Sequence, residues 1–154
     1  MLDRFVQFTA AISSIYRFIQ KIERDEMEKY GLKGAHAQYL LAMERHPEGI
    51  TAATLCEVCD KDKAAVSRIL SEMESKGLVA RADSGDSTYR ARMVLTQEGL
   101  AAAEFVRRKA ALAAEIAGKD LSDQERKAFY LTLEHIAGNI RAISRQGLPE
   151  DTAE

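Results

Sequence analysis

The stretch from Thr51 to Thr96 constrains the fold more than any other part of the chain. Within it, four apolar residues recur at the spacing i, i+3, i+4, i+7, which places them on one face of a helix. They are Val66, Ile69, Leu70 and Met73. Gly77 follows, and glycine commonly ends helices because it adopts the left-handed conformation without strain. A helix with one buried face is therefore predicted, ending near Gly77.

A shorter helix is predicted before this one, separated from it by a charged turn. Thr51 is suited to cap a helix that runs to Val58, because its hydroxyl accepts a free backbone N–H. The turn reads Asp60-Lys61-Asp62. Either aspartate is suited to cap the second helix, where the helix dipole also favours a negative charge.

The opposite face of the second helix is small, polar and basic. It carries Ala64, Arg68, Ser71 and Ser75, flanked by Lys63 and Ser67. Small residues let a helix approach the major groove closely, and long basic side chains reach guanine edges and phosphates. An ordinary solvated helix face has a similar composition, so this face alone leaves both interpretations open.

Two strand-like segments, 78–81 and 90–95, follow the second helix. Between them lies Asp83-Ser84-Gly85-Asp86-Ser87, a run of turn-forming residues. Two helices joined by a turn and followed by a hairpin form a winged helix-turn-helix. Strand alternation would place Arg90 and Arg92 on the same side of the wing.

This order of residues resembles the MarR family of bacterial transcription regulators. The matching positions are Ser67-Arg68, the segment 74–79, Arg81, Leu95-Thr96 and Gly99. The resemblance implies a mainly α fold with a small β-hairpin wing, and long terminal helices that join two subunits. It implies a homodimeric, sequence-specific regulator that binds an inverted repeat in double-stranded DNA, acts as a repressor and responds to a small aromatic or lipophilic ligand.

The resemblance also assigns residues to three sites. For DNA binding, they are Lys61, Lys63, Ala64, Ser67, Arg68, Ser71, Tyr89, Arg90 and Arg92. At the base of the wing, Arg81 is expected to pair with Asp83 or Asp86. For the ligand, they are Phe8, Ile12, Tyr16, Tyr39 and Met43, although an apolar helix face more often forms plain core.

Heptad spacing of apolar residues predicts that long helices pack against each other at both ends of the chain. The predicted interface residues are Phe5, Ile15, Ile19 and Ile22 near the N-terminus, and Phe129, Leu133, Ile136, Ile140 and Ile143 near the C-terminus. The spacing leaves open whether these two seams meet within one chain or join two chains. A further helix, 97–117, is expected after Thr96 and would bury a face containing Leu100, Ala103 and Val106.

The predicted organisation is one structural domain with three functional regions. Residues 1–34 and 118–146 would form the dimerisation region, 35–117 the DNA-binding region with its connecting helix, and 147–154 a frayed acidic tail. The net charge of −2 argues against a general polyanion binder. The segment 61–92 nevertheless holds seven basic and five acidic residues, which makes it mildly positive. No apolar run is long enough to cross a membrane and no signal peptide is evident, so a cytoplasmic location is expected.

The remaining reactive residues suggest an alternative of metal or redox sensing. Cys56 and Cys59 form a C-x-x-C pair, but zinc needs four ligands and the sequence has no second cysteine pair. His36, His46 and His135 lie far apart, so only the fold could bring them together. The sequence holds no catalytic constellation, so neither an enzyme nor a cofactor is expected. A helical interaction module that does not bind DNA is the other alternative.

Overall fold

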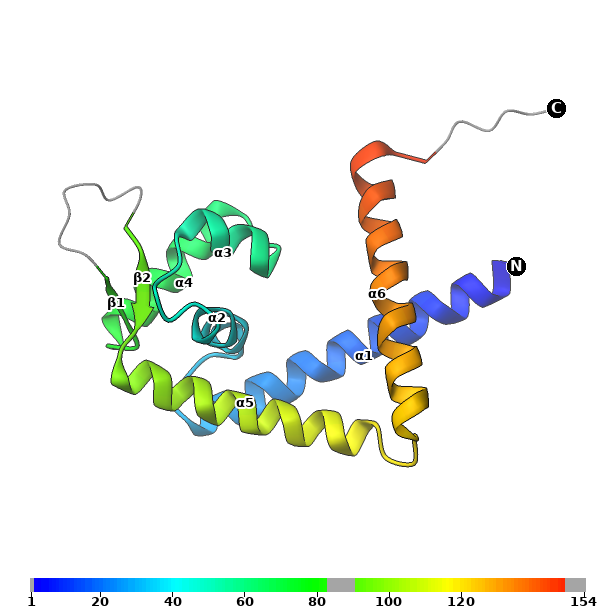
Figure 1. Ribbon diagram of the computed structural model, residues 1–154, viewed down its shortest axis with the longest axis horizontal. Helices are drawn as coiled ribbons and strands as arrows, with labels where there is room; N and C mark the ends of the chain where they lie inside the picture. Colours follow the sequence, from blue (N-terminus) through cyan, green and yellow to red (C-terminus); the bar gives the residue numbers. More distant parts are fainter. Residues whose placement is uncertain (1, 83–90, 149–154) are drawn as a thin grey trace. The chain divides into compact units, whose positions relative to one another are not determined.

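The computed structural model describes residues 2–82 and 91–148. The chain divides into two compact units, Met1–Ala111 and Leu112–Glu154. The elements are α1 (Leu2–Lys29), α2 (Gly34–Glu44), α3 (Ala52–Cys59), α4 (Lys63–Ser75), β1 (Val79–Arg81), β2 (Met93–Leu95), α5 (Gln97–Ala117) and α6 (Asp123–Gln146) (Figure 1). This confirms the predicted fold class, mainly α with a small β-hairpin.

Side-chain caps define the ends of the central helices. The Thr51 hydroxyl accepts a hydrogen bond from the backbone N–H of Thr54 at 3.2 Å, which starts α3. At the start of α4, the Asp62 carboxylate accepts one from the N–H of Ala65 at 2.8 Å. Asp60 instead ends α3 in the left-handed conformation, at φ 52°. Of the two aspartates in the turn, Asp62 is therefore the cap of α4.

The hydrophobic core of the first unit surrounds α2. It draws residues from every element there, including Met27, Leu40, Met43, Leu55, Val66, Met73, Val79, Met93, Ala102 and Val106. On α4, Val66, Leu70 and Met73 are buried and Ile69 is partly buried, which confirms the predicted apolar face. Burying these side chains fixes the rotation of α4 and turns its opposite face outward.

The hairpin is shorter than the sequence predicted. β1 pairs with β2 in antiparallel register, with Val79 opposite Leu95. Leu78 lies outside the strand because its backbone N–H donates to the carbonyl of Met73 and closes the end of α4. Ile50 adds a bridge to Met93 through two backbone hydrogen bonds of 3.0 and 2.9 Å. This bridge anchors the start of the helix-turn-helix to the base of the hairpin.

Helix α5 packs through a face that only partly matches the predicted one, because Ala103 and Val106 are buried as predicted and Leu100 is not. Gly99, Ala102, Ala103 and Val106 are buried, whereas Leu100 is exposed. An ideal Cβ at Gly99 would lie only 1.9 Å from the carbonyl oxygen of Leu78. This close backbone approach sets the rotation of α5, so the prediction for Leu100 was wrong.

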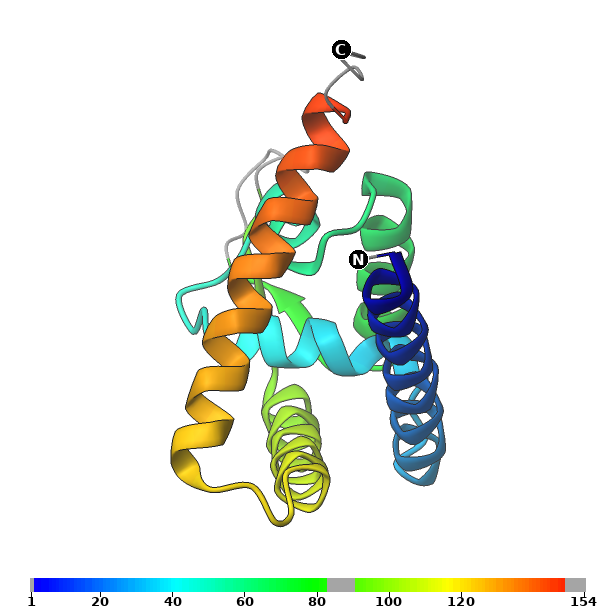
Figure 2. The ribbon, with the colours of Figure 1, turned by 90° about the vertical axis from the view of Figure 1, so that its right-hand side faces the viewer.

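Helix α2 runs crosswise to α1 (Figure 2), and α5 is tied to both helices by polar and aromatic contacts. The rings of Tyr30 and Phe105 stack with centroids 4.7 Å apart. Lys109 pairs with Glu26 of α1 at 2.9 Å. A further ion pair at 3.4 Å joins Arg107 to Glu44 of α2.

In the second unit, α6 begins with the predicted capping box. The Ser122 hydroxyl accepts from the N–H of Glu125, and the Glu125 carboxylate accepts from the N–H of Ser122. None of the α6 residues within the described range is buried. Across the described residues, no helix has both the length and the apolar character that a membrane span requires.

Candidate nucleic-acid interface

The outward face of α4 carries the residues that the sequence assigned to the major groove. Ala64, Ser67, Arg68 and Ser71 are exposed, as is Lys63 at the first position of the helix. The face is narrow because its centre consists of an alanine and two serines. A helix of this kind can approach base edges closely while Arg68 reaches further.

The turn before α4 contributes a second basic position. Lys61 is exposed, and its backbone N–H donates to the carbonyl of Cys56 at 3.0 Å, which holds the turn against α3. Lys61 and Arg68 both line a groove of about 360 Å³ between α2 and α4. Its wall on α2 includes Gln38 and Tyr39. The structure therefore brings Lys61 and Arg68 to one surface.

The described part of the wing is limited to its base. Tyr89, Arg90, Asp83 and Asp86 lie outside the described residues. Arg92 is exposed just before β2, and its carbonyl accepts a hydrogen bond from the N–H of Ala82 at 2.8 Å.

Arg81 has a partner that the sequence did not suggest. Its Nε lies 4.0 Å from an oxygen of Glu74 on α4. The two side chains are equally exposed, so this weak pair joins the base of the wing to the end of α4. The predicted pairing of Arg81 with Asp83 or Asp86 stays a prediction.

A buried histidine links α2 to α4. The side chain of His36 is completely buried, and its Nδ1 accepts a hydrogen bond from the backbone N–H of Lys33 at 3.2 Å. The other ring nitrogen, Nε2, therefore carries the proton and donates to Glu72 at 3.3 Å. Lys33 donates to both oxygens of the same carboxylate, at 2.9 and 3.0 Å.

We call Lys33, His36 and Glu72 the Glu72 bridge. Burial lowers the pKa of His36, which favours the neutral imidazole. The hydrogen bond from Lys33 lowers the pKa of Glu72, so the carboxylate stays ionised. Sequence reasoning missed this bridge, because its partners are 36 and 39 positions apart. The one local signal was the presence of acidic residues, Glu72 and Glu74, on the helix that carries the small and basic face.

The metal and redox residues do not come together. His46 lies 3.3 Å from Glu48, and within the described ranges no three residues of the metal-binding types are grouped. Cys56 and Cys59 are free thiols on α3. Burial raises the pKa of the Cys59 thiol, which disfavours the reactive thiolate. His135 lies on the exposed surface of α6.

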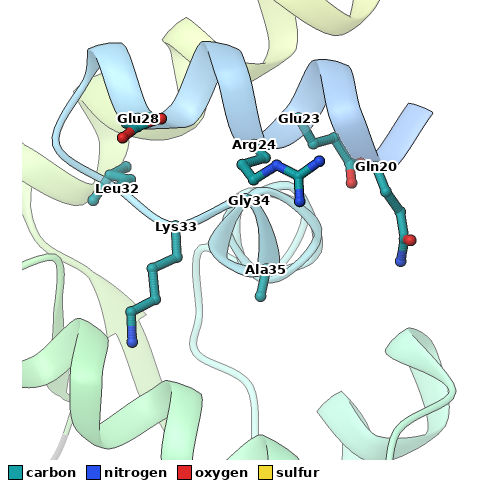
Figure 3. Close-up of a pocket in the computed structure, with 8 residues that line it drawn as sticks. All are labelled: Gln20, Glu23, Arg24, Glu28, Leu32, Lys33, Gly34 and Ala35. Carbon is teal, nitrogen blue, oxygen red and sulfur yellow. The ribbon is translucent and has the colours of Figure 1, made fainter. Parts of the chain in front are cut away.

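The five residues assigned to a ligand site have different environments. Tyr39 and Met43 are buried in the core, Phe8 is half-buried, and Ile12 and Tyr16 are exposed on α1. A second groove of about 490 Å³ lies between α1 and α2, lined by the polar residues Gln20, Glu23, Arg24, Glu28 and Lys33 with Leu32, Gly34 and Ala35. Figure 3 shows Arg24 beside the start of α2, with the Lys33 side chain directed away from it. Neither described groove includes Phe8, Ile12, Tyr16 or Met43.

The predicted interface residues on the terminal helices are exposed or only partly buried in the single chain. On α1, Phe5, Ile15, Ile19 and Ile22 are all exposed. On α6, Phe129, Ile140 and Ile143 are exposed, while Leu133 and Ile136 are partly buried. Monomeric soluble proteins rarely leave large apolar stripes in water.

The module consists of two helices joined by a tight turn, with a narrow exposed face on the second helix and an antiparallel hairpin after it. This arrangement defines a winged helix-turn-helix protein. The sequence profile of the MarR family matches residues 30–87, the segment that holds this module. The matched segment is therefore similar to the MarR family, and the chain has the fold of the solved MarR-family structures.

Three solved structures illustrate the similarity. A MarR family transcriptional regulator from Listeria monocytogenes, complexed with a 26mer DNA, has a TM-score of 0.80 at 19% identity, covering 93% of this chain and 97% of that one. One from Silicibacter pomeroyi has a TM-score of 0.72 at 25% identity, covering 84% and 87%. A mutant of MarR from E. coli, complexed with operator DNA, has a TM-score of 0.73 at 18% identity, covering 88% and 97%. Among curated proteins, no match was found.

Proposed function

We propose that this protein is a homodimeric regulator of transcription that binds double-stranded DNA through α4. The observation that carries the proposal is the exposed face of Ala64, Ser67, Arg68 and Ser71, opposite a stripe buried in the core. The complexes of the Listeria and E. coli proteins with DNA support it. In this proposal α4 enters the major groove, while Lys61, Lys63 and Arg92, with Tyr89 and Arg90 of the wing, meet the DNA around it.

The dimer part of the proposal draws on the terminal helices. A second copy of the chain is the occupant we assign to the apolar stripes of α1 and α6, which lie in water in the single chain. The regions 1–34 and 118–146 would then form the dimerisation region that flanks the DNA-binding region. A two-fold dimer presents its two α4 helices to an inverted repeat.

The DNA sequence is best found by selection of bound duplexes from a random pool, followed by footprinting. We expect an inverted repeat whose half-site centres lie about 10 base pairs apart, because both helices would use one face of the duplex. A footprint over one asymmetric half-site, occupied by a single chain, would contradict the dimeric arrangement. Failure to enrich any duplex at low salt would contradict DNA binding itself.

We further propose that a small aromatic or lipophilic ligand releases the protein from DNA, so that it acts as a ligand-responsive repressor. The support is the family resemblance, together with the exposed aromatic side chain of Tyr16 on α1. The test is a screen of aromatic carboxylates and lipophilic compounds for release of the selected duplex. A compound that releases DNA equally well from a Tyr16→Ala variant would argue against that part of the predicted ligand site.

A further inference from the structure

Next to the outward face of α4 stands an acidic residue, Glu72, at a position where it could neutralise Arg68. Arg68 and Glu72 are four residues apart, and side chains at that spacing are neighbours on a helix surface. Both residues line the groove between α2 and α4. An arginine and a glutamate placed in this way usually attract each other, and a paired arginine is less available to DNA.

In the structure the carboxylate is bound elsewhere. Both oxygens of Glu72 accept hydrogen bonds from Lys33, at 2.9 and 3.0 Å, and one also accepts from His36 at 3.3 Å. Among the described residues, Glu72 forms an ion pair with Lys33 and a hydrogen bond with the neutral ring of His36, and no ion pair joins it to Arg68. The Glu72 carboxylate is therefore directed to the start of α2.

We propose that Lys33 is a positioning residue for DNA binding, which holds the Glu72 carboxylate away from Arg68 and leaves the guanidinium available to DNA. This inference rests on the proposed function. Without Lys33, the carboxylate would be free to pair with Arg68, and that pair would have to break on DNA. An unneutralised carboxylate next to α4 would also repel the phosphates.

Two features of the bridge support this role. The Lys33 hydrogen bond lowers the pKa of Glu72, so this side of α4 carries a negative charge at neutral pH. His36 is fixed by burial and by the N–H of Lys33, so it provides a rigid second donor. His36 alone supplies one hydrogen bond from a neutral ring, which leaves the second oxygen of the carboxylate without its charged partner.

The test measures binding of four variants to a fluorescent duplex selected from a random pool and to a scrambled duplex. Lys33→Met should bind the selected duplex roughly three- to tenfold more weakly than the wild type at low salt. Lys33→Met with Glu72→Gln should recover most of this loss, since the amide cannot neutralise Arg68. Lys33→Met with Glu57→Gln has the same net charge but changes an exposed residue of α3, and it should not recover. Lys29→Met is the matched control, because Lys29 is 66% exposed and Lys33 is 65% exposed, each paired with a glutamate.

Three results would overturn the proposal. An unchanged affinity of Lys33→Met would show that the bridge does not matter for DNA. Failure of the Glu72→Gln double variant to recover would show that Lys33 itself contacts phosphate. If the Glu57→Gln double variant recovered affinity equally well, the effect would come from net charge alone.

A measurement without DNA separates this inference from the proposed function. In NMR spectra, the Nε–H signal of Arg68 should shift and be protected from exchange in Lys33→Met, as expected for a new pair with Glu72. The shift should be absent from the double variant with Glu72→Gln. If the wild type binds no duplex while this signal appears, the proposed function fails and the role of Lys33 in holding Glu72 stands. If the signal does not change in Lys33→Met, the inference fails whatever the DNA result.

Discussion

The ring of His36 on α2 donates a hydrogen bond to the carboxylate of Glu72 on α4 at 3.3 Å, from a completely buried position. Its other nitrogen is occupied as an acceptor for the backbone N–H of Lys33. Protonating the ring would break that second bond and bury a charge. The hydrogen bond from Lys33 therefore depends on the neutral form of the imidazole, whereas the bond to Glu72 does not.

This dependence predicts a loss of stability in mild acid. Burial lowers the pKa of His36 in the folded chain below its ordinary value of 6.5, so the unfolded chain takes up the proton first as the pH falls. The contribution of His36 is fully present above about pH 6.5 and is lost as the pH falls towards the folded pKa, with a slope of at most about 1.4 kcal/mol per pH unit.

Urea denaturation at a series of pH values between 7.5 and 5, roughly the range in which a histidine titrates, would measure this slope. A His36→Gln variant should be less stable at neutral pH, but its free energy of unfolding should change less across the pH series. Glu72 would not obscure the result, because its lowered pKa places its own loss of stability at a more acidic pH. Parallel curves for the two proteins would rule out His36 as the titrating group.

Charges introduced into the terminal seams should break the dimer. Ile15→Glu with Ile136→Glu places a carboxylate in each seam, and a buried seam cannot solvate it. We expect a monomer, or insoluble protein, in sedimentation velocity. Leu131→Glu is the control, since Leu131 is 59% exposed on α6 and lies off the heptad positions. A soluble double variant that still sediments as a dimer would mean that other surfaces hold the subunits together.

Arg68 and Arg92 should contribute to DNA binding in different ways. Arg68→Ala should cost about 1–3 kcal/mol and relax the base preference at one position in each half-site. Arg92→Ala should weaken binding to selected and scrambled duplexes alike, and reduce the log–log salt slope by about one. Salt titrations of both variants on both duplexes would measure this. If Arg92→Ala affected only the selected duplex, the base of the wing would be reading sequence.

Two glycines predict opposite effects of the same substitution. At Gly99 an added Cβ would lie 1.9 Å from the carbonyl oxygen of Leu78, so Gly99→Ala should force α5 away from the hairpin and cost about 3 kcal/mol. At Gly138, inside α6, a Cβ would meet nothing within 4 Å. Gly138→Ala should therefore stabilise the protein by roughly 0.5–1 kcal/mol, because glycine is a poor helix former. Thermal unfolding of the two variants would check this, and equal shifts would refute the packing explanation.

The sequence alone was sufficient where the deciding residues are close in the chain. The caps at Thr51 and Ser122 each accept from a backbone N–H three residues on, and the end of α4 at Gly77 depends on one backbone conformation. For α4 the sequence offered Asp60 or Asp62 as the cap, and the structure selected Asp62. The buried stripe of α4 follows from helical periodicity. These are local interactions, so a window of a few residues contains all the atoms that decide them, and the outward face of α4 followed from the same periodicity.

Tertiary packing decided the remaining features, because their partners are distant in the sequence. Leu100 and Ala102 both fit an apolar face of α5, and the close approach of Gly99 to Leu78 chose between them. Glu72 is adjacent on the helix to Arg68, a partner that local spacing suggests. The packing of α2 against α4 brought Lys33 within 2.9 Å instead. An ion pair forms with whichever charge the fold brings nearest, and that distance is set by the core beneath the two helices.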